Sequence, residues 1–132
     1  MVCAVVDTNV LISALLTQKG DTATLKVLEK ILEGEVTLIY CKAIIAEYRD
    51  VLSRKKFGFS TDLIDGLIKH IESHGVMLEY TPSGMVLADM DDLPFYELAL
   101  QNEGTYLITG NIRHFPAQSF IVTPRAFLNI VD

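Results

Sequence analysis

The sequence has no tryptophan, only two cysteines and no long hydrophobic run, and these shortages exclude several classes of protein. Cys3 and Cys41 are too few for a disulfide framework and match no zinc-ligand spacing. No apolar stretch approaches the roughly 18–20 residues of a membrane span. The first residues also lack the basic segment of a secretion signal. We therefore expect a cytoplasmic protein with reduced thiols and no membrane association.

Positive charge is scarce as well. The 132 residues include 17 Asp and Glu but only 11 Lys and Arg, which gives a formal net charge of −6. This balance argues against a protein that coats nucleic acid through bulk charge, but not against an enzyme that gathers carboxylates around metal ions. Half of the residues are hydrophobic, enough for a core at this length without disulfides or metals. We expect one domain over residues 1–132.

Short apolar strands alternate with amphipathic helices along the chain. Strands are predicted at 2–6, 36–40, 76–80, 105–108 and 120–122. Helices are predicted at about 10–16, 25–32, 42–54, 60–73, 92–102 and 125–130. The alternation predicts an α/β fold with a central, mainly parallel sheet of four to five strands. Because ligands bind such sheets at the carboxyl ends of the strands, the acidic residues at those ends are the candidates for function.

Three acidic residues fall at that edge of the predicted sheet. Asp7 follows the first strand, Glu47 lies one turn into the helix after the second, and Asp92 opens the helix before the fourth. Clustered carboxylates repel one another, and hard cations such as Mg²⁺ or Mn²⁺ relieve the repulsion. Each residue alone has an ordinary interpretation, as a helix cap, a solvated helix residue or a first-turn acid. Their coincidence at strand ends carries more weight than any one of them.

No motif for a different catalytic chemistry is present. The sequence lacks the nucleophile elbow of hydrolases, the phosphate-binding loop and the dinucleotide-binding fingerprint. His70 and His74 are four residues apart on a predicted helix, where we expect ordinary helix-face histidines. A phosphotransfer domain with Asp7 as its nucleophile is disfavoured, because the phosphatase type needs a second aspartate where this chain has Asn9.

Several segments resemble those of PIN-domain ribonucleases, in the same order. They are Asp-Thr-Asn-Val-Leu-Ile-Ser-Ala-Leu at 7–15, Ile-Ile-Ala-Glu-Tyr-Arg-Asp-Val-Leu at 44–52, Asp-Met-Asp-Asp-Leu-Pro-Phe at 89–95 and Thr-Tyr-Leu-Ile-Thr-Gly-Asn at 105–111. Residues 122–128, Val-Thr-Pro-Arg-Ala-Phe-Leu, resemble the ending of a bacterial branch with VapC-like toxins of toxin–antitoxin pairs. The resemblance covers essentially the whole chain.

This resemblance implies a three-layer α/β/α fold and an endoribonuclease that depends on Mg²⁺ or Mn²⁺. The catalytic, metal-binding acids of the family match Asp7, Glu47 and Asp92. Its supporting polar positions match Asn9 and Thr109, the latter a hydroxyl that helps to orient the acids. The implied partners are an RNA substrate, a small antitoxin protein and a second copy of the chain.

One position departs from the family pattern. The fourth acid of the family would fall at position 111, where this chain has Asn111. An amide oxygen can ligate a metal but lacks the negative charge, so we expect a weakened catalytic site. Asp89 or Asp91 could compensate, and the alternative function is a weakly active or inactive PIN-fold module that binds an antitoxin or RNA. Arg113, in the same loop, and Arg49 are the candidates for contacts with the RNA phosphates.

Overall fold

The computed structural model describes residues 1–17 and 22–132 of the chain. Within these residues, one sheet has the strand order β3-β2-β1-β4-β5, and all of its neighbouring strands are parallel. The strands are β1 (Val2–Val6), β2 (Val36–Tyr40), β3 (Val76–Met77), β4 (Thr105–Ile108) and β5 (Ile121–Val122). The α-helices are α1 (Thr8–Leu16), α2 (Ala23–Leu32), α3 (Lys42–Leu52), α4 (Thr61–His74), α5 (Leu93–Gln101) and α6 (Pro124–Val131). The short 3₁₀ helices are η1 (Lys55–Phe57), η2 (Met90–Asp92) and η3 (Ile112–His114).

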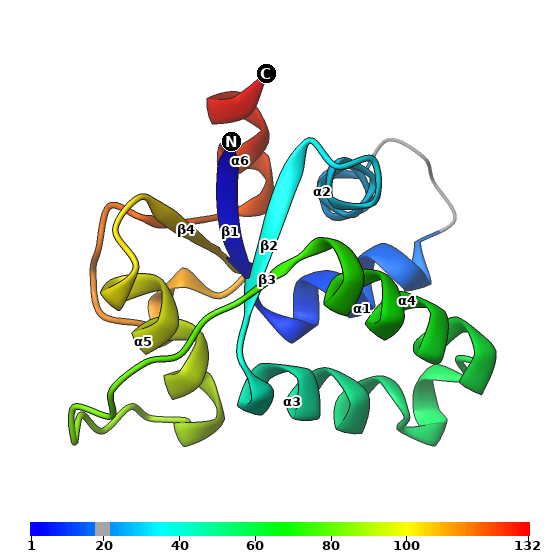
Figure 1. Cartoon of the computed structure of the whole chain (residues 1–132), viewed down its shortest axis with the longest axis horizontal. Coiled ribbons are helices and arrows are strands. Elements are labelled where there is room, and N and C mark those ends of the chain that lie inside the picture. The colour runs from blue at the N-terminus through cyan, green and yellow to red at the C-terminus, as the bar shows by residue number, and fades with distance from the viewer. Residues whose placement is uncertain (18–21) are drawn as a thin grey trace.

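The sheet is the middle one of three layers (Figure 1). On one side, α2 and α4 both pack against β2, and on the other side α5 packs against β1 and β4. The three-layer α/β/α fold with a parallel sheet is therefore confirmed. None of the helices in the described residues is both long enough and apolar enough to cross a membrane.

β1 is the central strand and is buried on both faces. It lies between β2 and β4, and Ala4, Val5 and Val6 have no solvent exposure. A continuous apolar run suits this position, because neither face of the strand meets water. The residue that follows β1 therefore lies at the edge of the sheet, next to the buried core.

The carboxyl ends of the strands meet at one edge, because the strands are parallel. This is the lower edge of the sheet in Figure 1, where β1 leads into α1 and β2 leads into α3. The first junction is Asp7 and the second is Cys41. The side chains at this edge therefore come from segments that are far apart in the sequence.

β3 is shorter than the sequence predicts, with two residues instead of the five at 76–80. Its residues pair with Ile39 and Tyr40 of β2, and the Leu78 N–H donates one further hydrogen bond to the Tyr40 carbonyl at 2.9 Å. β2 then ends, because the chain turns into α3, so residues 79 and 80 have no strand to pair with. The prediction of a strand through Tyr80 was wrong for this reason.

Other boundaries differ by one to three residues. The first helix begins at Thr8 rather than at residue 10, and β5 covers 121–122 rather than 120–122. The predicted loops at 82–91 and 110–119 contain η2 and η3, respectively. These 3₁₀ turns shape the two loops that approach the carboxyl edge of the sheet.

Gly75 directly follows α4, at a position with no room for a side chain. A Cβ atom there would lie 2.6 Å from the carbonyl oxygen of Leu38 and 2.7 Å from that of Ile71. Both oxygens belong to the backbone, so neither can yield without moving β2 or α4. Gly66, by contrast, lies within α4 and faces open space.

We predict opposite effects for alanine at these two glycines. Gly75→Ala should lower the free energy of unfolding by about 1–3 kcal/mol, the usual cost of overpacking. Gly66→Ala should raise it by about 0.5–1 kcal/mol, because alanine is the better helix former and meets no obstruction. Urea unfolding followed by circular dichroism measures both. Equal stability of the two variants would contradict the close approach at Gly75.

Candidate functional site

The carboxylate of Asp7 is buried at the end of the central strand. Its side chain is 6% exposed, and the Thr109 hydroxyl, directly after β4, donates to its Oδ2 at 2.7 Å. The Asp7 N–H donates to the Ile108 carbonyl at 2.9 Å, which fixes the backbone between the two strand ends. Asp7 occupies the N-cap position, directly before α1.

Burial is the main influence on the charge of Asp7. Desolvation raises the pKa of Asp7 above its ordinary value, because removal from water disfavours the charged form. The hydrogen bond from Thr109 acts in the opposite direction, followed by the backbone N–H groups of Asn9 and Thr8 and, most weakly, by the charge of His114. The neighbours of Asp7 thus offset only part of the effect that burial has on its pKa.

Glu47 reaches the same edge from α3. The hydroxyl of Thr8, the first residue of α1, donates to Oε2 of Glu47 at 3.3 Å. Burial raises the pKa of Glu47, and the negative charge of Asp91 raises it further. Because Thr8 directly follows Asp7, its contact with Glu47 joins the segment that carries the first acid to the helix that carries the second.

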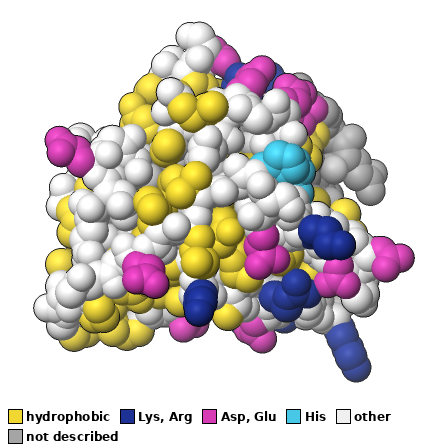
Figure 2. All heavy atoms as spheres, in the orientation of Figure 1, with side chains coloured by type: hydrophobic (Ala, Val, Ile, Leu, Met, Phe, Trp, Pro, Cys, Tyr) yellow, Lys and Arg dark blue, Asp and Glu magenta, His cyan; other side chains and the backbone are white. Residues whose placement is uncertain are grey.

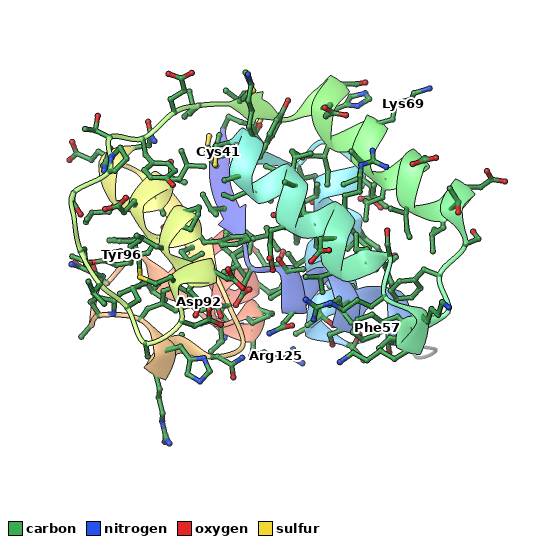
Figure 3. All side chains as sticks on the ribbon, turned by 90° about the horizontal axis from the view of Figure 1, so that it is seen from below. Cys41, Phe57, Lys69, Asp92, Tyr96 and Arg125 are labelled. Atoms are coloured by element: carbon green, nitrogen blue, oxygen red, sulfur yellow. The ribbon has the colours of Figure 1, made fainter. Side chains whose placement is uncertain are left out.

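Asp92 lies at the start of α5, and its pKa is raised to about 6. Burial is the largest cause, the charges of Asp7, Asp89 and Glu47 add to it, and His114 opposes it. Figure 3 looks onto this edge of the molecule and places Asp92 beside α5, facing the region between that helix and α3. The charges of Asp7 and Glu47 both act on Asp92, so we refer to these three residues as the acidic site.

The acidic site has the donor chemistry that a hard divalent cation prefers. Its carboxylates come from three different elements, and no ion pair in the described part of the chain involves any of them. Partly desolvated carboxylates that repel one another fit Mg²⁺ or Mn²⁺ by charge and by donor type. In residues 1–17 and 22–132, however, no three His, Cys, Asp or Glu side chains are already close enough to hold an ion. Binding would require the carboxylates to draw together.

Asn111 is joined to the acidic site through its backbone. Its N–H donates to Oγ1 of Thr109 at 3.0 Å, so a single hydroxyl contacts both Asn111 and Asp7. The side chain is exposed, and the residue precedes η3, which carries His114. Because His114 lowers the pKa of both Asp7 and Asp92, this turn brings positive charge to the acids.

Asp89 and Asp91 surround the acidic site without forming part of it. The carboxylate of Asp89 accepts the N–H of Asp91 at 2.9 Å and so caps η2. The charge of Asp89 acts on Asp92, and that of Asp91 acts on Glu47. Both residues add negative charge near the acidic site and so make the binding of a cation more favourable.

The remaining candidates from the sequence have other surroundings. The guanidinium of Arg49 forms an ion pair with Asp65 of α4 at 2.7 Å, on the surface between two helices. Arg113 lines an apolar hollow of about 320 Å³ after β4. Asn9 acts on Asp7 through its backbone N–H, which lowers the pKa of Asp7, whereas the side-chain hydrogen bond to Asp7 comes from Thr109.

Two residues with contacts near the site are not singled out by the sequence pattern. Thr8 lies inside the Asp-Thr-Asn segment, whose middle residue has no assigned role. Glu97 of α5 is 1% exposed, and its Oε1 accepts hydrogen bonds from the N–H and the hydroxyl of Ser83. These bonds hold the loop after β3 on α5, just ahead of the turn that carries Asp92. The only signal for Glu97 is an acid within the apolar run at 95–99.

Comparison with known proteins gives one family. A family model described as a PIN domain matches residues 3–113. The matched segment includes Asp7, Glu47, Asp92 and Asn111, together with four of the five strands. No curated protein matches the chain.

We predict that Asp92 makes the metal-free protein less stable as the pH rises. The pKa of Asp92 is about 6 in the folded protein and lies above its value in the unfolded chain, so the stabilisation is complete below about pH 4 and is lost as the pH passes 6. Asp92→Asn should therefore be more stable than the unmodified protein at pH 7, with a difference that shrinks towards pH 4. Urea unfolding in EDTA at several pH values tests this. Asp62→Asn, exposed on α4, is the control, and a difference for Asp92→Asn that is independent of pH would refute the prediction.

Proposed function

The chain belongs to the PIN-domain family, whose members are generally nucleases, and from that premise we propose that it is a metal-dependent endoribonuclease. The observation that carries the proposal is the acidic site at the carboxyl edge of the parallel sheet. There Asp7 is buried, and its charge together with that of Glu47 raises the pKa of Asp92. In the absence of a cation, the negative charges of these three carboxylates repel one another.

Asp7, Glu47 and Asp92 would hold the ion, with the amide oxygen of Asn111 as a neutral contact. A bound Mg²⁺ or Mn²⁺ supplies positive charge that balances the carboxylates and the phosphate and lowers the pKa of a bound water. Thr109 and Thr8 each donate to one carboxylate oxygen and thereby restrict the rotamers of Asp7 and Glu47.

Cleavage also needs a group that accepts the proton of the attacking water and groups that contact the phosphates of the RNA. Asp92, at the start of α5, is the proposed acceptor of the proton that the attacking water must lose. His114 brings positive charge to the same edge, and Arg113 follows Asn111 in the same turn. These two residues are the proposed contacts with the RNA backbone, whereas Arg49 is engaged by Asp65.

We further propose that the protein is the toxin of a cytoplasmic toxin–antitoxin pair. The resemblance of residues 122–128 to one bacterial branch supports this role, with a small antitoxin and a second copy of the chain as partners. A hollow of about 340 Å³ between α2 and α4 offers an apolar surface for a protein partner. Leu32 and Leu63, two of the residues that line it, are 44% and 43% exposed.

The second candidate function is binding without efficient cleavage, and Asn111 is the observation that favours it. The exposed amide at this position adds no negative charge to the three carboxylates. A PIN fold with a weak metal site would still present the same surfaces to RNA or to an antitoxin.

Removal of the Asp7 charge should abolish cleavage and preserve the fold. We expect Asp7→Asn to cut RNA at least about 100-fold more slowly with Mn²⁺ or Mg²⁺, because loss of a ligand costs no less than the 10–100-fold seen for outer partners. Its free energy of unfolding should not fall, since the amide avoids the cost of burying a charge. Mass spectrometry of a mixed RNA substrate and urea unfolding measure the two. Cleavage by Asp7→Asn at the rate of the Asp62→Asn control would refute the assignment.

Restoration of the fourth charge distinguishes the two candidate functions. Asn111→Asp should bind Mn²⁺ more tightly and cut RNA faster, because it adds a negative charge on the residue whose N–H contacts Thr109. Isothermal titration with Mn²⁺ and single-turnover cleavage are the measurements. Asn129→Asp, an exposed position on α6, adds the same charge elsewhere and should change neither. If Asn111→Asp leaves both quantities unchanged, Asn111 does not limit the site.

A further inference from the structure

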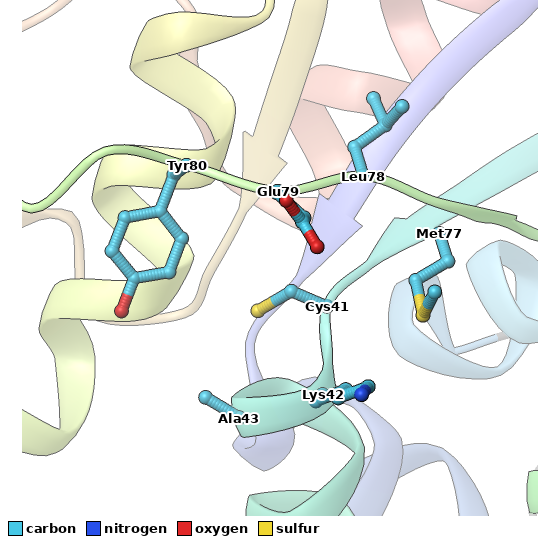
Figure 4. A pocket seen from close by; sticks show the side chains of 7 residues that line it. All are labelled: Cys41, Lys42, Ala43, Met77, Leu78, Glu79 and Tyr80. Carbon is cyan, nitrogen blue, oxygen red and sulfur yellow. The ribbon is translucent and has the colours of Figure 1, made fainter.

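The carboxyl edge of the sheet also holds a pocket that the nuclease chemistry above does not use. It is a hollow of about 220 Å³ between the start of α3 and the segment that follows β3 (Figure 4). Its polar lining comes from Lys42, Glu79 and Tyr80, and its apolar lining includes Cys41, Met77 and Leu78. We refer to it as the β3 pocket.

The β3 pocket is a neighbour of the acidic site. Cys41 directly precedes α3, and Glu47 lies less than two turns further along the chain, within that helix. Tyr48, one residue after Glu47, is fully buried, and its hydroxyl donates at 2.5 Å to the carbonyl of Val6, the residue before Asp7. After burial, the charges of Asp7 and Cys41 are the next causes that raise the pKa of Tyr48. The β3 pocket and the acidic site therefore lie on the same edge of the sheet.

The walls of the pocket offer three different kinds of contact. In Figure 4 the Glu79 carboxylate points from the segment after β3 towards Cys41. The Tyr80 ring lies at the end of the pocket that is nearer to α5. Lys42 and Met77 lie on the opposite side of Cys41. No ion pair among the described residues engages Lys42 or Glu79, so both charges are available to a ligand.

The start of α3 adds sites for an anion. Cys41 makes no side-chain capping hydrogen bond, so the first N–H groups of this 11-residue helix lack a side-chain partner at the pocket. Such groups, with the ammonium of Lys42 beside them, favour a phosphate. The pocket thus combines a place for an anion with an aromatic wall and a carboxylate acceptor.

The surrounding surface is apolar. Figure 2 shows hydrophobic side chains from the middle of this face, over β3, to its lower left, over the loop that follows. Val76, Met77 and Val86 belong to these segments and are 42%, 50% and 80% exposed. A flat, uncharged ring would meet little cost of desolvation here.

We propose that the β3 pocket binds one nucleobase of the RNA beside the bond that is cut, and that it prefers guanine. The proposal rests on the proposed ribonuclease function. The volume lies below the roughly 300–1,000 Å³ of pockets for drug-sized ligands, which suits a single base. Unpaired RNA bases are bound by stacking on aromatic rings and by hydrogen bonds to their Watson–Crick edge, the roles of Tyr80 and Glu79.

The preference for guanine follows from the hydrogen bonds that the Glu79 carboxylate can make. An ionised carboxylate only accepts hydrogen bonds. Guanine presents two adjacent N–H donors on its Watson–Crick edge and can pair with both carboxylate oxygens. Uracil presents a single N–H between two carbonyl oxygens, which would face the carboxylate unfavourably. Adenine and cytosine each present one amino group beside a ring nitrogen that only accepts. Guanine is therefore preferred to adenine and cytosine, and uracil is last.

Nucleotide binding without metal tests the pocket directly. Protein labelled with ¹³C at its methionine methyl groups is titrated in EDTA with 5′-GMP, 5′-CMP and 5′-UMP. We expect the Met77 signal to shift, with GMP binding most tightly and UMP most weakly. The Met1 signal, at the opposite edge of the sheet, should not move. Equal affinities for the three nucleotides, or a Met77 signal that does not shift, would overturn the proposal.

Two variants assign the contacts. Tyr80→Ala should weaken GMP binding about tenfold, because base–aromatic stacking is lost. Glu79→Gln should reduce the ratio of GMP to UMP affinity at least about fivefold, because one oxygen becomes a donor. Glu103→Gln, exposed in the turn before β4, makes the same change in charge outside the pocket and should alter neither. Urea unfolding checks that each variant is folded, and a GMP preference that survives Glu79→Gln contradicts the role of Glu79.

Cleavage of RNA, measured separately, distinguishes this proposal from the one on which it rests. If GMP shifts the methyl signal of Met77 but no RNA is cut, the base-binding role of the pocket is supported and the ribonuclease function is refuted. If RNA is cut while no nucleotide shifts Met77, the nuclease stands and the pocket proposal falls. Cleavage next to guanine, lost in Glu79→Gln, would support both.

Discussion

The burial of the Asp7 carboxylate is the constraint on which the carboxyl edge of the sheet depends. β1 is the central strand, so the residue after it has little access to water and must find partners within the protein. The parallel register supplies one: Val6 pairs with Ile108, so the next residues along, Asp7 and Thr109, meet as acid and hydroxyl. The same contact orders the turn after β4, because Thr109 also accepts the N–H of Asn111.

Side chains rather than secondary structure hold the rest of this edge. The hydroxyl of Thr8 connects α1 to Glu47, and Glu97 holds Ser83 on α5. Gln101, four residues after Glu97, exchanges two hydrogen bonds with the backbone of Thr81, at 2.7 and 2.8 Å. The long segment between β3 and Asp92 is therefore attached to α5 at two points, although it contains almost no regular structure. The loops at this edge are positioned by specific polar contacts.

The sequence predicts the parts of this arrangement that follow from topology. A parallel sheet brings strand ends together whatever the details, so the position of Asp7 after β1 already places it at the edge where Glu47 and Asp92 also lie. The direction of Arg49 depends on Asp65, a partner 16 residues away on another helix, and periodicity carries no information about it. The length of β3 likewise depends on where β2 ends, and the contact between Glu97 and Ser83 depends on the path of a loop. The sequence pattern therefore does not predict side-chain contacts between residues that are far apart in the chain.

The two edge strands have a consequence for how the molecule meets its neighbours. β3 and β5 contain two residues each, whereas the strands inside the sheet contain four or five. A long exposed edge would offer a row of unpaired backbone groups on which another chain could aggregate. Edges of two residues offer very little of such a template. Association of copies of this chain through helices and side chains is therefore favoured over extension of the sheet from one molecule into the next.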